Sequence, residues 1–313
     1  SPVSTHNPNP AAPSDDASPQ QQKQMESAYA NMKRKMSMQE IGRKIKHKVM
    51  VLSGKGGVGK STVATGLALS LAQEGHSVGI LDIDITGPNV PKMMGLDRKR
   101  LHVEQGRIHP AQGHLGVKVI SMAFLLEDED TPVVWRGPIK LGAINQFIGD
   151  VEWGELDYLV IDFPPGTSDE PLTVAQSLPD IDGMVIVTTP QDIALLDARR
   201  GLKMFEKVNI PIIGIVENMA MHTCSKCGNE EHIFGSGGAE KMCRDYGVSL
   251  LGSLPLDIKI REQSDNGNPT VVAEPESSAA KTYKKIARLT AIKVSKLAQD
   301  YSNKFPNIVI QKT

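Results

Sequence analysis

Cysteine and net charge are both scarce in this chain. It has three cysteines in 313 residues, and its basic and acidic residues nearly cancel, which leaves a formal charge of −1. So few cysteines cannot form the disulfide framework of a small secreted protein. A nearly neutral chain also has no overall positive field to attract nucleic acid or an anionic membrane. We therefore expect neither of these partners.

Long apolar runs are missing as well. No stretch approaches the roughly 20 apolar residues that a membrane-spanning helix needs. The first residues also lack the basic and apolar segments of a secretory signal, so we expect a cytoplasmic protein. With 40% hydrophobic residues, the chain can nevertheless bury the core of one large domain.

Apolar runs of strand length alternate with helical patterns through most of the chain. Strands are expected at residues 47–52, 77–82, 117–121, 157–162, 183–188, 211–216 and 248–253. Helices are expected between them at 63–72, 138–149, 170–178, 192–207, 236–246 and 257–266, and a small hairpin at 101–109. This alternation predicts an α/β fold with a mostly parallel sheet covered by helices on both faces.

The two ends of the chain differ from this central domain. Residues 1–23, which are rich in Pro, Ser, Asn and Gln, are expected to be a disordered tail. Residues 24–46 suggest an irregular amphipathic helix that packs on the core or on a partner. The central domain is then expected at 47–275, with a cysteine loop at 219–235, and a C-terminal helix and tail at 276–313.

The most informative segment is VLSGKGGVGKST at residues 51–62, an apolar strand that enters a glycine-rich turn before a helix. Such glycines let consecutive backbone N–H groups converge on phosphate oxygens. Lys60 can reach the terminal phosphates, and the Ser61 hydroxyl can bind Mg²⁺. The residues predicted to bind the nucleotide here are Gly54, Lys55, Gly56, Gly57, Val58, Gly59, Lys60, Ser61 and Thr62.

Three aspartates follow predicted strands. Asp82 and Asp84 end one strand, and Asp162 ends another before a sharp turn that contains Gly166. Because ligands bind at the carboxyl ends of parallel strands, these residues are candidates for the nucleotide site. Asp162 has the context of a carboxylate that holds Mg²⁺ through water, and Gly166 can offer its N–H to the terminal phosphate. Taken alone, Asp82 and Asp84 could also be helix-capping or turn residues.

Cys224 and Cys227 are spaced so that both thiols can bind one metal. The chain has no second such pair to complete a zinc ribbon, and Cys243 lies on an apolar helical stripe, which favours a core thiol. A symmetric dimer would bring four thiolates together, which is the ligand set of a [4Fe–4S] cluster. Zinc remains the alternative, bound by the same dimeric set or within one chain with His222 and His232.

The phosphate loop resembles the deviant Walker A box, Lys-Gly-Gly-x-Gly-Lys-Ser/Thr, of the ATPase family that includes ParA, MinD, nitrogenase iron protein and the Mrp/ApbC iron–sulfur carriers. The cysteine pair makes the chain most similar to the Mrp/ApbC carriers, over about residues 45–270. Trp135-Arg136-Gly137-Pro138 and residues 233–238 belong to the same resemblance. It implies a P-loop NTPase fold in which Lys55 crosses a dimer interface to the partner's nucleotide.

The resemblance also implies roles for individual residues. The catalytic residues would be Lys55, Lys60 and Asp84, with Asp84 positioning the attacking water. Ser61, Asp82 and Asp162 would serve the Mg²⁺ ion. Asn218 resembles the residue that reads adenine, and Pro255 lies in a segment, 254–257, that looks like the loop covering the purine. Both remain weaker signals, because an Asn after a strand is as often a cap or turn residue.

The function implied is that of an ATP-binding and hydrolysing homodimer that takes a [4Fe–4S] cluster from a donor and passes it to apo iron–sulfur proteins. One alternative is a ParA/MinD-type positioning ATPase acting on DNA or membrane. It is kept open by basic residues on the C-terminal helix, namely Lys281, Lys284, Lys285, Arg288, Lys293 and Lys296. Another is an ATPase whose cysteine pair holds a structural zinc.

Overall fold

The computed structural model describes residues 19–304 except 85, 86, 88, 98, 105, 126–143, 145–149, 167–174, 176–180, 207, 208, 225, 226 and 228. Helices predicted at 138–149 and 170–178, the 135–138 motif and both chain ends fall mainly outside these residues. The described part forms an eight-stranded sheet in the order β12-β9-β8-β1-β7-β2-β6-β5. The strands are β1 (Ile45–Ser53), β2 (Val78–Asp82), β5 (Ala111–Gln112), β6 (Lys118–Ser121), β7 (Leu156–Asp162), β8 (Gly183–Thr188), β9 (Ile212–Glu217) and β12 (Leu250–Ser253).

All neighbouring strands of this sheet run parallel except β5, which is antiparallel to β6. The prediction of a mostly parallel α/β sheet is therefore confirmed. The two-residue strand β5 has no alternating pattern and was missed. The predicted hairpin is present as β3 (His102–Glu104) and β4 (Arg107–His109).

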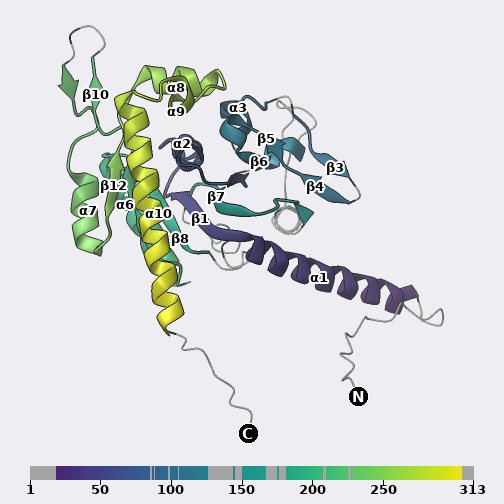
Figure 1. Ribbon diagram of the computed structural model, residues 1–313. Coiled ribbons are helices and arrows are strands. Elements are labelled where there is room, and N and C mark those ends of the chain that lie inside the picture. The colour runs from purple at the N-terminus through teal and green to yellow at the C-terminus, as the bar shows by residue number, and fades with distance from the viewer. Residues whose placement is uncertain are drawn as a thin grey trace.

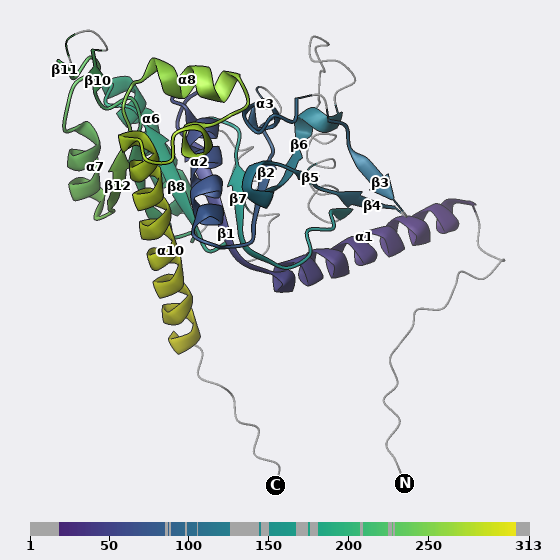
Figure 2. The ribbon, with the colours of Figure 1, turned by 45° about the horizontal axis from the view of Figure 1, so that its top comes forward.

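Helices cover both faces of the sheet (Figures 1 and 2). On one face α2 (Lys60–Gln73) packs beside the C-terminal helix α10 (Ser278–Lys304). On the other face lie α6 (Asp192–Glu206) and α7 (Gly238–Tyr246). In β1, Val49 and Val51 join the core of the first face while Met50 joins that of the second. A strand buried on both faces explains why β1 reads as a continuous apolar run instead of an alternating one.

The remaining described elements are short and lie around the sheet. They are α3 (Val90–Met93), α8 (Ile258–Asp265), α9 (Thr270–Ala273), β10 (His222–Thr223), β11 (Glu230–Glu231), and the 3₁₀ turns η1 (His114–Gly116) and η2 (Met122–Leu125). Helix α8 matches the helix predicted at 257–266. The other elements have too few residues to show a periodic pattern.

Helix α1 (Pro19–Lys44) extends away from the body of the molecule (Figures 1 and 2). It begins at Pro19 instead of residue 24, so residues 19–23, expected to belong to a tail, are helical. Proline suits the first turn of a helix, whose N–H groups have no helical partner. Its described apolar side chains Met25, Tyr29, Met32 and Met36 are exposed. These described side chains do not pack on the core, and the side chains of Met38 and Ile41 lie outside the described part. No described helix is long and apolar enough to cross a membrane.

The register of the central strands places the predicted residues together. Val51 of β1 lies opposite Asp162 of β7, and Asp162 lies opposite Asp82 of β2. The phosphate loop, residues 54–59, joins the end of β1 to α2. The loop and the aspartates thus meet at the carboxyl ends of the central strands.

Candidate functional site

The phosphate loop has the backbone shape that its glycines predict. Gly57 and Gly59 adopt φ angles of 79° and 80°, a left-handed region that L side chains rarely occupy. Asn218, after β9, donates a hydrogen bond from Nδ2 to the carbonyl of Val58 at 2.9 Å. A Cβ at Gly59 would collide with that amide. Glycine is therefore required at 59 for its backbone angle and for the close approach of Asn218.

A cavity of about 410 Å³ lies over this loop. It is lined by Ser53, Gly56, Gly57, Gly59, Lys60, Ser61, Thr62, Asp84, Gly87, Asn89, Met93, Pro165 and Met219. Most of the predicted phosphate-binding residues thus face one space, together with Asp84. Asn89 and Met93 were not predicted, since a short turn without a motif carries no signal of a ligand.

Lys60 is buried between carboxylates from two strands. Its Nζ lies 2.5 Å from Oδ1 of Asp162 and 3.5 Å from Oδ2 of Asp84. The other oxygen of Asp162, Oδ2, is buried and has no hydrogen-bond partner among the described residues. A buried carboxylate oxygen beside the Ser61 hydroxyl is a donor set that suits Mg²⁺, which prefers oxygen ligands and water. The residues present therefore fit the metal predicted here.

Asp82 lies deeper than Asp84 and is fully buried. Its carboxylate accepts hydrogen bonds from Ser121 Oγ at 2.9 Å and from the Asp84 N–H at 3.1 Å. Burial, and then the charge of Asp162, raise the pKa of Asp82 well above its usual range. Burial also raises the pKa of Asp162, against the opposing charge of Lys60. Asp82 thus lies beneath the cavity and is bonded to the backbone of Asp84. Its partner Ser121 is recognisable in the sequence only as a polar residue at a strand end.

Lys55 is not among the residues that line the cavity. Its Nζ donates a hydrogen bond to Oε1 of Gln191 in the same chain, at 3.2 Å. Gln191 directly precedes α6 and was not singled out from the sequence, because a glutamine before a helix is unremarkable. In this single chain, Lys55 is therefore bonded within its own subunit.

Gly166 is also engaged within the chain, because its N–H donates to the carbonyl of Ser53 at 2.9 Å. Contact of this N–H with a phosphate, as predicted, requires that bond to open. Residues 85, 86 and 88, which follow Asp84, and residues 167–169, which follow Gly166, lie outside the described residues.

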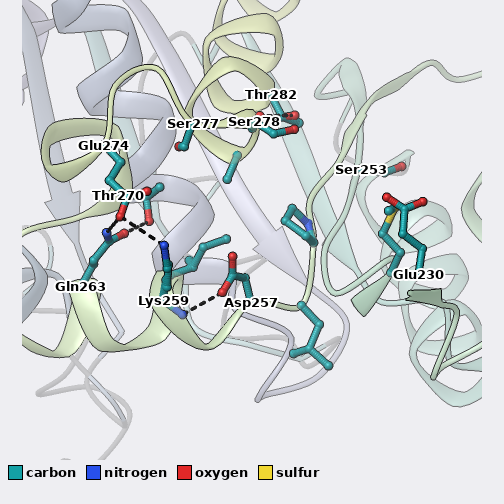
Figure 3. Close-up of a pocket in the computed structure, with 15 residues that line it drawn as sticks. Glu230, Ser253, Asp257, Lys259, Gln263, Thr270, Glu274, Ser277, Ser278 and Thr282 are labelled. Carbon is teal, nitrogen blue, oxygen red and sulfur yellow. Dashed lines mark hydrogen bonds and ion pairs between the residues drawn. The ribbon is translucent and has the colours of Figure 1, made fainter. Parts of the chain in front are cut away.

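Pro255 lines a second cavity, of about 310 Å³, between the β10–β11 hairpin, α8, α9 and α10 (Figure 3). Gln263, Thr270 and Glu274 gather on one side of this cavity, and Glu230 and Ser253 on the other. None of the phosphate-loop residues lines it. The structure therefore does not bring Pro255 into the phosphate cavity, and Asn218 lines neither of the two.

The cysteine pair lies at the tip of the hairpin formed by β10 and β11, which projects from the domain (Figure 1). Cys224 is half-buried, Cys227 is exposed, and the Cys224 N–H donates to the carbonyl of Asn229 at 2.9 Å. Residues 225, 226 and 228 lie outside the described residues. Two thiols at an exposed tip are accessible to a second copy or to another protein.

His222 and His232 do not converge on this pair in the described structure. Nδ1 of His222 lies 3.1 Å from the carbonyl of Leu256, and Nδ1 of His232 lies 3.0 Å from that of Ala220. Within the described part of the chain, no three His, Cys, Asp or Glu residues are arranged to hold a metal ion. The single-chain zinc set is therefore not assembled there. Cys243 is buried, as predicted, and burial raises the pKa of its thiol.

A family model described as ParA, the NUBPL iron-transfer P-loop NTPases, matches residues 44–291. The chain belongs to this family. Its resemblance to iron–sulfur carriers of the P-loop NTPase class is thereby confirmed.

Curated relatives share much of the sequence. An iron–sulfur cluster carrier protein of Pseudomonas fragi is 56% identical over 246 residues, covering 78% of this chain and 84% of the relative. One from Methanocaldococcus jannaschii is 48% identical over 282 residues, covering 90% of this chain and 94% of the relative.

Solved structures show the same fold. A nucleotide-binding protein of Archaeoglobus fulgidus, in complex with ADP, matches with 40% identity and a TM-score of 0.68, covering 77% of this chain and 93% of the other. The cell division ATPase MinD of Pyrococcus furiosus matches with 26% identity and a TM-score of 0.57, covering 80% and 99%. These neighbours confirm the P-loop NTPase fold class.

Proposed function

We propose that this protein binds and hydrolyses ATP as a homodimer and carries a [4Fe–4S] cluster from a donor to apo iron–sulfur proteins. The observation that carries the proposal is an accessible Cys224–Cys227 pair on a hairpin of the same domain that holds a complete phosphate loop. The names of the relatives, iron–sulfur cluster carrier proteins, support it.

At the nucleotide, Lys60 exchanges partners. Its ammonium pairs with Asp162 and Asp84 in this structure and would turn to the β- and γ-phosphates when ATP enters. That exchange would leave Asp84, which faces the cavity, able to orient a water molecule. The water attacks the γ-phosphorus, the bond to the bridging oxygen breaks, and ADP leaves with that oxygen.

Mg²⁺ would be held by Ser61 directly and by Asp162 through water, and when bound it would neutralise phosphate charge. Asp82 would keep its bonds to Ser121 and to the backbone of Asp84, and so fix the position of the Asp84 carboxylate. This assigns Asp82 a supporting role, in agreement with its complete burial.

For the base, Asn218 would read adenine with its amide while its Nδ2 stays near Val58. Pro255, which follows β12, would cover the purine. Its separate cavity in this structure means that the loop at 254–257 would have to approach the phosphate loop when nucleotide binds.

The cluster would be cargo held between two copies. Each chain supplies two thiolates, so four are available when a two-fold axis passes between the hairpins. Transfer would exchange these thiolates for those of the recipient: recipient thiols lose protons, carrier thiolates gain them, and the cluster keeps its oxidation state. The exposure of Cys227 at the tip suits such a ligand exchange.

The positioning-ATPase alternative depended on the basic face of α10, and part of that face is occupied within the chain. Glu74, the residue that follows α2, accepts from Arg288 at 3.0 Å and pairs with Lys284 at 3.2 Å, while Lys293 donates to Ser249. These contacts attach α10 to the domain. They give the helix a structural role that requires no DNA or membrane.

The deciding experiment is the metal content of protein reconstituted anaerobically with iron and sulfide. We expect about four iron atoms per dimer and a broad brown absorption that bleaches in air. Colourless protein that retains stoichiometric zinc, or a stable cluster on a proven monomer, would contradict the bridged cluster.

A further inference from the structure

Helix α6 and the residue that precedes it contact the phosphate loop. Gln191 accepts a hydrogen bond from Lys55, and a Cβ added to Gly54 would overlap the backbone of Asp197 and Ala198. The loop and the helix are therefore packed backbone against backbone, and Lys55 is hydrogen-bonded to the residue that precedes the helix. Displacement of Lys55 would therefore break its hydrogen bond to the residue that leads into α6.

Pro190 and Leu195 also contact the segment that follows the cysteine hairpin. A Cβ at Gly238, the first residue of α7, would overlap the side chain of Leu195 and lie 3.5 Å from the carbonyl oxygen of Pro190. A Cβ at Gly235 would lie 3.8 Å from that oxygen. Leu195 is buried in the core that α6 and α7 share. Residues 190–195 thus lie between the phosphate loop and the segment leading from the hairpin into α7.

A strand end connects the two regions as well. Glu217, next to Asn218, accepts from the N–H of Ala239 in the first turn of α7 at 3.3 Å. This bond anchors the start of α7 to the sheet edge that holds the nucleotide residues. The start of α7, which follows the hairpin, is thus in contact both with residues 190–195 and with the strand end that holds the nucleotide residues.

Lys55 has two alternative partners in the proposed reaction, which supplies the two states that coupling requires. One is the neutral amide of Gln191, seen in this structure. The other is the phosphate of a nucleotide, whose charge binds an ammonium more strongly than an amide does. Nucleotide binding in a closed dimer can therefore withdraw Lys55 from Gln191.

We infer that residues 190–195 couple the nucleotide state to the cysteine hairpin, with Gln191 as the positioning residue that holds Lys55 when no phosphate is bound. The inference rests on the proposed carrier function. It assigns the path by which ATP alters the release of a cluster bound some distance from the phosphate loop.

The test changes the path at both ends in the full-length chain. Gln191→Leu removes the amide oxygen and keeps the side-chain size, whereas Gly238→Ala adds a Cβ against Leu195. Lys203→Gln, at an exposed position in the last turn of α6, is the matched control. For each reconstituted protein, iron content, ATP turnover and the rate of cluster transfer to apo-aconitase are measured with ATP and with ADP.

Wild type and Lys203→Gln should transfer the cluster at rates that differ by about fivefold or more between the two nucleotides. Gln191→Leu and Gly238→Ala should bring this ratio close to one while iron loading is retained. Gly238→Ala should also keep wild-type ATP turnover, because it touches no residue of the phosphate cavity. Circular dichroism and ADP binding establish that each variant is folded.

A further variant separates a positioning role from a structural one. Gln191→Glu should hold Lys55 as an ion pair and lower ATP turnover, and high salt should partly restore it because salt screens exposed charges. In a Lys55→Ala background, the same change should have no further effect on turnover. An equal loss in that background would assign Gln191 to folding alone and overturn the inference.

The outcomes distinguish the two proposals. Wild-type protein that binds no cluster after reconstitution would overturn the carrier function itself. If wild type carries a cluster but transfers it equally fast with ATP and ADP, or if both path variants keep the wild-type ratio, the coupling inference is wrong and the carrier function stands.

Discussion

At the scale of single residues, the phosphate site is held together by charge compensation. Lys60 sits beside Asp162 and near Asp84, and all three side chains are buried. A buried charge is tolerated only when it is paired, so the lysine proposed to bind phosphate and the two carboxylates beside it stabilise one another. Asp82 is kept in place by Ser121 and the backbone of Asp84 instead.

Lys60→Ala should abolish productive phosphate binding, whereas Asp84→Asn should keep ATP affinity and suppress turnover, because one residue contacts phosphate and the other directs water. Calorimetric titration with ATP and steady-state turnover measure the two effects. Thermal melting serves as the control, since loss of Lys60 leaves buried carboxylates uncompensated. An equal loss of ATP affinity in both variants would refute this division of roles.

At the scale of elements, Asp157 at the start of β7 connects neighbouring strands at the end of the sheet opposite the phosphate loop. It pairs with Lys46 of β1 at 2.6 Å and accepts from the N–H of Ser77 at 2.9 Å. The hydrogen bond from Lys46, and then that from the Ser77 backbone, lower the pKa of Asp157 to about 2, from a usual 3.8.

Because its pKa is lowered in the folded state, ionised Asp157 stabilises the fold above pH 3.8, and this contribution is lost as the pH falls to about 2. Asp157→Asn should therefore lower the melting temperature at pH 7 but make little difference near pH 2. The effect should be small, since Lys46 is exposed. Melting curves across this range, with Glu155→Gln as an exposed control, test it. A constant difference at every pH would exclude the carboxylate as the cause.

The cysteine hairpin is the second element with its own prediction. Replacing Cys224 or Cys227 by Ser should abolish cluster binding and leave ATP binding intact, because the hairpin tip lies outside the phosphate cavity. Cys243→Ala should keep the cluster at a packing cost of roughly 1 kcal/mol. Iron analysis and ATP titration of the three variants decide this. Loss of the cluster in Cys243→Ala would reassign the ligand set.

At the scale of the whole molecule, one sheet carries two separate candidate sites. The carboxyl ends of β1, β2 and β7 gather the phosphate residues, whereas β9 leads to the hairpin with the cysteines. Helix α10 belongs to the core, since Tyr283, Ile286 and Val294 are buried against it. Helix α1 leaves the domain and exposes its apolar residues.

A dimer with composite sites would be detected by mixing variants. If Lys55 acts on the partner's nucleotide, Lys55→Ala and Asp84→Asn each damage a different half of one site. A mixed dimer then contains one intact site, and activity should return to about half of the wild-type value per dimer, since both sites work independently in the simplest case. Turnover is measured after mixing, with heterodimers verified by native mass spectrometry. No recovery would assign Lys55 a role within its own chain.

The sequence was sufficient for several features that depend on local pattern. The parallel strands, the left-handed glycines of the phosphate loop, the strand-end aspartates and the buried Cys243 follow from apolar runs, glycine spacing and helical periodicity. These features are encoded by residues near one another in the chain.

Contacts between distant segments required the folded structure. The hydrogen bond of Lys55 to Gln191 joins residues 136 positions apart, and that of Asn218 to Val58 spans 160 positions. The exposure of α1 and the separation of Pro255 from the phosphate cavity also depend on how helices pack. Such contacts leave no local periodicity, because they result from the order of strands in the sheet and from the helices that this order brings together.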